Sequence, residues 1–220
     1  MKTYIVTGGA GFIGSYVIQE LLKQEDVFIY NIDKMGVGSS KENIVDDPRV
    51  ENHVIDIAND EHWRMHMTNP LAWISREIDY VIHLAAESHV DRSIDNPLSF
   101  VDSNIVGTAK ILEMVRKQKA RMVHVSTDEV YGHLARQDPP FTEDSPLKPR
   151  SPYSASKASS DLLVESYINT YNIRATITRC CNNYGPRQHS EKLIPTVLNS
   201  IFTGKKIPVY GTGENIREWI

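Results

Sequence analysis

The chain has 220 residues, 40% hydrophobic and 24% charged, with a formal net charge of −4 and a pI near 6.1. This composition is that of a globular protein long enough to bury a core, and it gives no basic field that would attract nucleic acid or an anionic membrane. The two cysteines, Cys180 and Cys181, are neighbours, so neither a disulfide framework nor a metal site is indicated.

Apolar runs of strand length alternate with longer helical patterns, which predicts βαβ units and a parallel sheet. In chain order we expect strands over 3–7, 27–32, 51–55, 80–84, 122–126 and 175–178. We expect helices over 12–23, near 61–67, and over 98–117, 153–171 and 193–202, with a short last strand over 207–210. The Pro-rich stretch 138–152 is expected to be a long loop.

The fold class predicted is therefore α/β, with a doubly wound, mostly parallel sheet. A dinucleotide-binding domain is expected over residues 1–181, followed by the start of a smaller, incomplete substrate-binding region over 182–220. No stretch approaches the roughly 20 apolar residues of a membrane span, and the first residues lack a secretory signal pattern. We expect a cytoplasmic protein without a membrane partner.

The segment TGGAGFIG (7–14) follows the first expected strand and opens the first expected helix. Gly8, Gly11 and Gly14 allow a tight turn and a close approach of a pyrophosphate to the helix N-terminus. Asp33 ends the second strand, where a carboxylate binds ribose hydroxyls and favours NAD over NADP, although Lys34 beside it leaves NADP open. A purely structural turn is the competing interpretation, and the matching positions of strand, helix and Asp33 disfavour it.

Polar residues with acid–base chemistry follow the fifth expected strand, in STDEVYG (126–132). Asp128 and Glu129 are adjacent carboxyls, which form either a solvated turn or a pair whose pKa values are pushed apart. Tyr153 and Lys157 are four residues apart and share a helix face, so we expect the ammonium to lower the pKa of the phenol. With the hydroxyl of Thr127, the pair predicts oxidation of a substrate hydroxyl by a nicotinamide cofactor.

These motifs, with LAAESHVDRSI (84–94), YSASK (153–157) and NNYGP (182–186), resemble the extended short-chain dehydrogenase/reductase family. Within it, EKLIP (191–195), PVYG (208–211) and the closing IREW resemble the nucleotide-sugar 4,6-dehydratases. The resemblance covers essentially the whole chain. Its most specific part is the Thr-Asp-Glu triplet, because epimerases of the same family lack this acid–base pair. Family members continue well beyond REW, so we expect a fragment or a truncated chain.

The resemblance implies an NAD-dependent lyase (a hydro-lyase) acting on a nucleotide-sugar, with dTDP-glucose as the expected substrate. In the implied reaction Tyr153 takes the proton of the 4-hydroxyl, Thr127 hydrogen-bonds that oxygen, and hydride passes from C4 to NAD. Because the resulting ketone acidifies the C5 proton, Glu129 can remove it while a protonated Asp128 donates to the departing 6-hydroxyl. Hydride then returns to C6, which gives a 4-keto-6-deoxy sugar.

The same resemblance assigns residues to two binding sites. The cofactor site is expected to contain Gly8, Gly11, Phe12, Ile13, Gly14, Asp33, Lys34, Met35, Gly36, Asp56, Ile57, Leu84, Ala85, Ala86, Ser88, Ser103, Tyr153, Lys157 and Asn183. The substrate site is expected to contain Ser88, Thr127, Asn182, Lys192, Leu193, Ile194, Pro195, Thr196, Val197, Pro208, Val209, Tyr210 and Arg217. For the apolar members of 193–202, an amphipathic packing helix is an equally good interpretation.

Other interpretations stay open at this point. The chain could be a UDP- or CDP-glucose 4,6-dehydratase, a nucleotide-sugar 4-epimerase or decarboxylase, or a catalytically silent NAD-binding fragment. The segment MGVG (35–38) departs from the family's usual loop, and His189 stands where an aromatic residue or proline is usual. His83 and His124 are expected to be core histidines. The family's habit also implies a homodimer, through a four-helix bundle of 98–117 and 153–171.

Overall fold

The computed structural model describes residues 1–62, 75–135 and 137–220. Its centre is a six-stranded parallel sheet in the order β3-β2-β1-β4-β5-β6. The strands are β1 (Lys2–Thr7), β2 (Val27–Asp33), β3 (Val50–Val54), β4 (Tyr80–His83), β5 (Arg121–Thr127) and β6 (Arg174–Cys180). This order confirms the doubly wound fold. The strand order reverses between β1 and β4, where such sheets bind ligands at their carboxyl ends.

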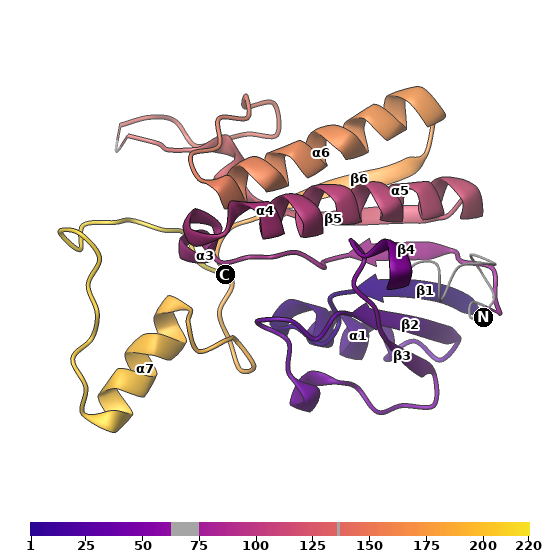
Figure 1. Cartoon of the computed structure of the whole chain (residues 1–220), viewed down its shortest axis with the longest axis horizontal. Helices are drawn as coiled ribbons and strands as arrows, with labels where there is room; N and C mark the ends of the chain where they lie inside the picture. The colour runs from indigo at the N-terminus through magenta and orange to yellow at the C-terminus, as the bar shows by residue number, and fades with distance from the viewer. Residues whose placement is uncertain (63–74, 136) are drawn as a thin grey trace.

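Helices cover both faces of the sheet (Figure 1). They are α1 (Phe12–Leu21), α3 (Val90–Asp95), α4 (Pro97–Phe100), the π-helical η2 (Val101–Val106), α5 (Gly107–Gln118), α6 (Pro152–Tyr171) and α7 (Leu193–Thr203). Two short 3₁₀ turns, η1 (Lys41–Asn43) and η3 (Asp128–Tyr131), lie in the connections. Across the described residues, no helix is both long and apolar enough to cross a membrane.

The alternation of side chains along β1 explains the two layers of the core. Ile5 packs on one face with Ile111 and Leu112 of α5, whereas Tyr4 and Val6 pack on the opposite face with α1. Successive residues of a strand point to opposite faces, so a run of buried residues such as β1 predicts a strand covered on both sides. In Figure 1, α5 and α6 lie side by side on their face of the sheet.

Two expected elements differ in the structure, and a third lies largely outside the described residues. The helix expected over 98–117 begins at Pro97 and has a π-helical middle section, and the short helix α3 before it was not predicted. The strand expected over 207–210 is wrong, because these residues form no regular structure. They are exposed and include Pro208, which lacks an N–H for pairing. The helix expected near 61–67 lies largely outside the described residues.

The last residues of the chain return to the sheet after a long excursion. Helix α7 lies apart from the sheet in Figure 1, and an irregular connection leads back to the C-terminus near β6. There Asn182 forms a parallel bridge with Trp219, and the N–H of Ile220 donates a 2.9 Å hydrogen bond to the Asn182 carbonyl. The expected boundary between residues 181 and 182 stays a prediction.

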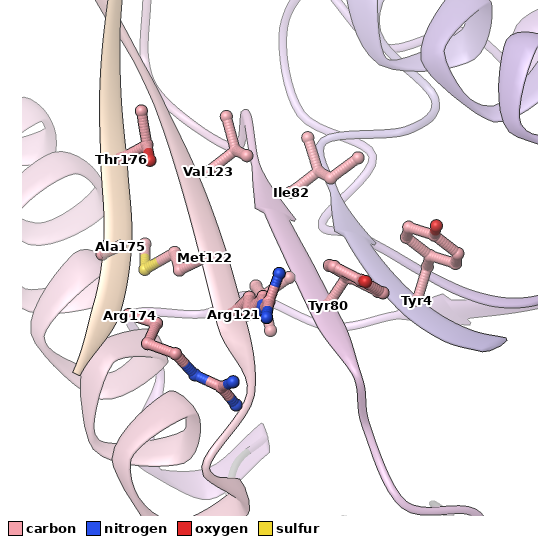
Figure 2. A pocket seen from close by; sticks show the side chains of 10 residues that line it. Tyr4, Tyr80, Ile82, Arg121, Met122, Val123, Arg174, Ala175 and Thr176 are labelled. Carbon is pink, nitrogen blue, oxygen red and sulfur yellow. The ribbon is translucent and has the colours of Figure 1, made fainter.

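A cavity of about 480 Å³ opens on one face of the sheet, around the amino ends of β4, β5 and β6 (Figure 2). Tyr4, Tyr80, Arg121 and Arg174 line it, and the rings of Tyr4 and Tyr80 stack 4.9 Å apart. Parallel sheets bind their ligands at the opposite, carboxyl end of the strands. This cavity is therefore not the candidate nucleotide site.

Candidate nucleotide and catalytic site

The glycine loop between β1 and α1 packs so closely against neighbouring backbone that side chains at Gly8 and Gly14 would not fit. Gly8 has φ +77°, and a Cβ on it would lie 2.8 Å from the backbone nitrogen of Ala85. A Cβ on Gly14 would lie 2.1 Å from the Gly8 carbonyl oxygen. Gly11 caps α1 without a side-chain hydrogen bond, so the first N–H groups of the helix remain available for an anion. Phe12 and Ile13 form that first turn. The loop fits a dinucleotide pyrophosphate.

Asp33 lies at the carboxyl end of β2, where its carboxylate is oriented by the loops around it. It accepts hydrogen bonds from the N–H of Ala10 (3.0 Å), the N–H of Met35 (2.8 Å) and the hydroxyl of Ser39 (2.8 Å). Met35 has a left-handed φ of 56°, which turns the divergent segment 35–38 back towards Asp33. Gly36 lies in the same turn. The carboxylate is thus fixed at the edge of the glycine loop.

Lys34, the residue that left NADP as a possible cofactor in the sequence analysis, is paired with other residues of the protein. Its Nζ lies 2.6 Å from Glu87 Oε1 and donates a 2.8 Å hydrogen bond to Ser103 Oγ. The structure therefore brings two expected cofactor residues, Lys34 and Ser103, into contact across the crevice. A lysine paired with a carboxylate is poorly placed to attract a 2′-phosphate, which favours NAD.

The segment after β4 is held against the glycine loop by residues that sequence reasoning missed. Thr7 Oγ1 accepts hydrogen bonds from the N–H groups of Leu84 (3.2 Å) and Ala85 (3.1 Å). Buried Asn104 accepts from the Glu87 N–H at 2.8 Å and donates to the Glu87 carbonyl at 3.0 Å and to Ser156 Oγ at 2.8 Å. Asn104 could have been identified from the sequence, because it is a polar residue on the face of an expected helix that should be buried. Ala86 and Ser88 lie in this same segment.

The acid pair occupies the 3₁₀ turn η3, directly after β5. Thr127 caps this turn, because its hydroxyl accepts a 3.3 Å hydrogen bond from the Glu129 N–H and donates one of 3.2 Å to Asp128 Oδ1. Burial raises the pKa of Asp128, although the Thr127 hydroxyl partly opposes this. Burial also raises the pKa of Glu129, and the Asp128 carboxylate adds to the rise. The pair is thus half-buried and electrostatically coupled, unlike a solvated turn.

Tyr153 stands in the first turn of α6, next to the acid pair. Ser151 and Ser154 form a reciprocal capping box and Pro152 follows the cap, so the start of the helix is fixed at this position. Burial raises the pKa of Tyr153, the carboxylate of Glu129 adds to the rise, and the Thr127 hydroxyl opposes it. The expected lowering of the Tyr153 pKa by the neighbouring lysine is therefore wrong for this structure, because burial and the Glu129 carboxylate raise that pKa.

Lys157 follows one helical turn later and is 4% exposed. Its Nζ donates a 2.9 Å hydrogen bond to the carbonyl of Val125 in β5. Burial lowers the pKa of Lys157 to about 8, and the negative charge of Asp161 opposes that fall. The structure therefore brings the Tyr-Lys pair and the Thr-Asp-Glu triplet together at the carboxyl end of β5, as the sequence predicted.

Some of the expected substrate residues after β6 interact with the catalytic side of the site, whereas others are exposed. Lys192 Nζ donates a 2.7 Å hydrogen bond to the Ser88 carbonyl, and the Tyr210 hydroxyl lies 3.4 Å from Asp91. The positive charges of Arg217 and Lys192 both act to lower the pKa of Glu129, which places them on the same side of the site. The first turns of α7 carry the half-buried residues Ile194, Pro195, Thr196 and Val197 and the exposed Leu193. Pro208 and Val209 are exposed and make no hydrogen bond given for the described residues.

The remaining expected residues lie around the rim. Asp56 caps the turn after β3 through a 2.9 Å hydrogen bond from the Ala58 N–H, and Ile57 is buried against Gly107. The Asn183 side chain donates 2.8 Å to the Cys181 carbonyl, and that of Asn182 donates 3.2 Å to the Glu218 carbonyl. No cluster able to hold a metal ion occurs among the described residues.

The fold and the site together define a class, an extended short-chain dehydrogenase/reductase with a dinucleotide cradle and a Tyr-Lys pair. A family model described as GDP-mannose 4,6 dehydratase matches residues 5–220. The dTDP-glucose 4,6-dehydratase of Mycobacterium tuberculosis (strain H37Rv) is 42% identical over 218 residues, 98% of this chain and 64% of that protein. The chain therefore belongs to the 4,6-dehydratase family that this model describes.

Two solved structures are similar to this chain over nearly its whole length. The dTDP-glucose 4,6-dehydratase DesIV of Streptomyces venezuelae, with NAD bound, is 43% identical with a TM-score of 0.90 and covers 99% of this chain and 67% of its own. A UDP-N-acetylglucosamine 4-epimerase from Methanobrevibacter ruminantium is 30% identical with a TM-score of 0.85, over 100% and 68% of the two chains. The present chain spans 64% of the curated M. tuberculosis relative.

Proposed function

We propose that this chain carries the catalytic centre of an NAD-dependent nucleotide-sugar 4,6-dehydratase, with dTDP-glucose as its substrate. The observation that carries the proposal is the position of Asp128 and Glu129. They lie half-buried in the turn that follows β5, where the charges of Glu129 and Asp128 both raise the pKa of Tyr153. Tyr153 and Lys157 suit the oxidation of a hydroxyl, and two more carboxyls suit the removal of water.

In the proposed reaction, Tyr153 accepts the proton of the sugar 4-hydroxyl. The Thr127 hydroxyl, which caps η3, hydrogen-bonds the same oxygen. We propose that the positive charge of Lys157 favours the phenolate form of Tyr153 during the reaction, although burial and the Glu129 carboxylate raise the pKa of that phenol in the structure. Bound NAD would supply the hydride-transfer chemistry, from C4 to C6, and a proton returned to C5 by Glu129 would complete the product, so no net oxidation of the sugar occurs.

The acid pair then removes water across C5 and C6. A ketone at C4 makes the C5 proton acidic, and Glu129 takes that proton as the base. Asp128 is assigned the role of the acid: it would enter this step protonated, a form that burial favours, and give its proton to the departing 6-hydroxyl. Adjacent carboxyls repel each other, so one of them ionises more readily than the other, and this split suits an acid and a base acting in one step.

The residues proposed to hold NAD are those of the cradle. The N-terminus of α1 would bind the pyrophosphate and Asp33 the adenosine ribose. The engagement of Lys34 by Glu87 and Ser103 supports NAD over NADP. Lys192 and Arg217 are proposed to bind the nucleotide diphosphate of the substrate, for which cations are suited.

Incubation with dTDP-, UDP- and CDP-glucose tests the proposal. We expect a 4-keto product, detected by its alkali-induced absorbance, to form most rapidly from dTDP-glucose. A 4-keto product formed mainly from UDP- or CDP-glucose would support a 4,6-dehydratase but assign it a different nucleotide. An epimerised product without loss of water would instead support the 4-epimerase alternative, which the acid pair disfavours. No conversion of any of the three sugars would contradict the proposal.

We also propose that the protein works in the cytoplasm as a homodimer, joined through the face formed by α4, η2 and α6. Apolar side chains are exposed on this face, with Leu98 at 71%, Val101 at 40% and Leu162 at 56%. Exposed apolar patches typically mark protein–protein contacts. Sedimentation should show a dimer that the double variant Leu98→Asp/Leu162→Asp dissociates. A wild-type monomer, or a dimer that survives both charges, would contradict this assignment.

A further inference from the structure

Beneath the Tyr153–Lys157 pair lies a buried carboxylate that the proposed reaction does not use. Asp161 stands on α6 one helical turn after Lys157 and is 0% exposed. Its Oδ2 accepts a 2.8 Å hydrogen bond from Arg179 Nε of β6, and its Oδ1 lies 3.3 Å from Nε2 of His124 in β5. Burying a carboxylate costs several kcal/mol of folding free energy unless it is paired.

Arg179 is itself held in place. Its NH1 group donates a 2.9 Å hydrogen bond to the hydroxyl of Tyr131, and its guanidinium lies 5.2 Å from the centre of the Tyr131 ring. Tyr131 belongs to the same turn as Asp128 and Glu129. Asp161 is therefore fixed between β5, β6 and the acid turn.

Among the described residues, no carboxylate forms a salt bridge with the Lys157 ammonium. Its Nζ donates to the Val125 carbonyl, a neutral acceptor that compensates no charge. Burial lowers the pKa of Lys157 to about 8, with the negative charges of Asp161 and Cys180 acting against the fall. Burial alone would raise the pKa of Asp161, but its interactions with His124, Arg179 and Ser126 outweigh it and hold that pKa low.

The titratable groups around this layer come from every neighbouring element. They are His83 of β4, His124 of β5, Arg179 and Cys180 of β6, Tyr131 of η3, and Tyr153 and Glu165 of α6. Burial lowers the pKa of His83 well below its usual value and that of His124 to about 4, so both rings are neutral at pH 7. Glu165 is 48% exposed and lies 3.6 Å from Arg179, at the edge of the layer. Burial raises the pKa of the half-buried Cys180 thiol. Asp161 is thus the fully buried anion of this layer.

We propose that Asp161, held by Arg179 and His124, is a positioning residue that keeps Lys157 in its charged form beneath Tyr153. It touches neither substrate nor cofactor and acts through Lys157. The part of this proposal that concerns turnover rests on the proposed function, whereas the charge of Lys157 can be measured without turnover. Loss of the Asp161 charge would leave the buried Lys157 without the fully buried carboxylate one helical turn further along α6.

The test is an NMR titration of the full chain with ¹³Cε-labelled lysine, in the wild type and in Asp161→Asn. Asn preserves the size of the side chain and an acceptor for Arg179. We expect the Lys157 midpoint, assigned with Lys157→Arg, to fall by about one pH unit in Asp161→Asn, the scale of a nearby opposite charge. Asp161→Glu should restore the midpoint. The matched control Glu165→Gln removes the exposed carboxylate from the same helix and should leave it unchanged.

If the enzyme turns over, the alkaline limb of its kcat/KM profile should move to lower pH in Asp161→Asn by the same amount. An unchanged Lys157 midpoint in Asp161→Asn would overturn the proposal, whether or not the protein dehydrates a sugar. Should Asp161→Asn fail to fold, the wild-type midpoint at low and high salt gives a second test. A buried partner is screened little, so the midpoint should be insensitive to salt. A midpoint that falls in high salt would assign the effect to exposed carboxylates instead.

Discussion

Glu129 is the residue on which the choice of reaction depends. Burial and the Asp128 charge both raise the pKa of Glu129, while the charges of Arg217 and Lys192 lower it. The pKa of this general base is thus set by opposing effects of its surroundings. Tyr153 illustrates the limit of sequence reasoning at this scale. The spacing to Lys157 predicted a lowered pKa, but the surrounding protein buries the phenol next to Glu129 and raises it. That burial depends on tertiary packing, which a four-residue spacing does not reveal.

The first prediction concerns Glu129→Gln, which preserves size but removes the base. We expect this variant to reduce bound NAD when given dTDP-glucose, because oxidation at C4 needs only Tyr153 and Lys157. Dehydration should fall by about 10²–10⁴-fold, the range for loss of a general base. Glu143→Gln, on the exposed loop before α6, is the control. Dehydration at the wild-type rate would remove Glu129 from the proposed role.

At the scale of elements, the junction of β1 with α1 was the easiest part to predict. Its glycines follow a buried strand and precede an amphipathic helix, and their spacing has a direct steric reason. The connection from 97 to 118 was harder, since the π-helical section Val101–Val106 leaves the apolar pattern largely intact. The strand expected over 207–210 was wrong, because a strand also needs a neighbouring strand to pair with, and local composition does not show whether one is there. Asn104 and the Lys34–Glu87 pair likewise join residues far apart in sequence.

The second prediction concerns Gly14→Ala at this junction. The added Cβ would lie 2.1 Å from the Gly8 carbonyl oxygen, so the loop must shift and the cradle must open. We expect NAD affinity, measured by calorimetry, to fall at least about tenfold, equivalent to about 1.4 kcal/mol. Glu20→Ala, on the exposed last turn of the same helix, should bind NAD as the wild type does. Unchanged affinity in Gly14→Ala would place the dinucleotide elsewhere.

At the scale of the whole molecule, the doubly wound parallel sheet, with its ligand crevice at the carboxyl ends of the strands, followed from the βαβ alternation. The chain covers 64% of its curated M. tuberculosis relative, and α7 projects away from the sheet with Phe202 85% exposed. The roles of the residues from 192 onward consequently stay predictions. The interior of the sheet also carries neutral buried histidines, and they make the stability of the whole fold depend on pH.

The third prediction is this pH dependence. Burial, with the nearby Lys157 charge, lowers the pKa of His124 to about 4 from its usual 6.5. As pH falls below 6.5 the unfolded chain takes up the proton first, so stability declines between pH 6.5 and 4 and is unaffected by this group above that window. Urea unfolding should show a loss of about 2 kcal/mol from His124 between pH 7 and 5.

His124→Gln supplies the control, because Asp128 and Glu129, with raised pKa values, act in the opposite direction in both proteins. The difference between the two unfolding free energies should shrink as the pH is lowered from 7 to 5. A difference that stays constant over this range would show that His124 is not held neutral by burial.

Dehydration by oxidation at C4 and return of hydride to C6 is tested most directly with dTDP-glucose carrying deuterium at C4. Mass spectrometry and NMR of the product locate the label. We expect a 4-keto product lighter by one water, with the deuterium at C6. A product of unchanged mass with the deuterium still at C4, or no product at all, would contradict it.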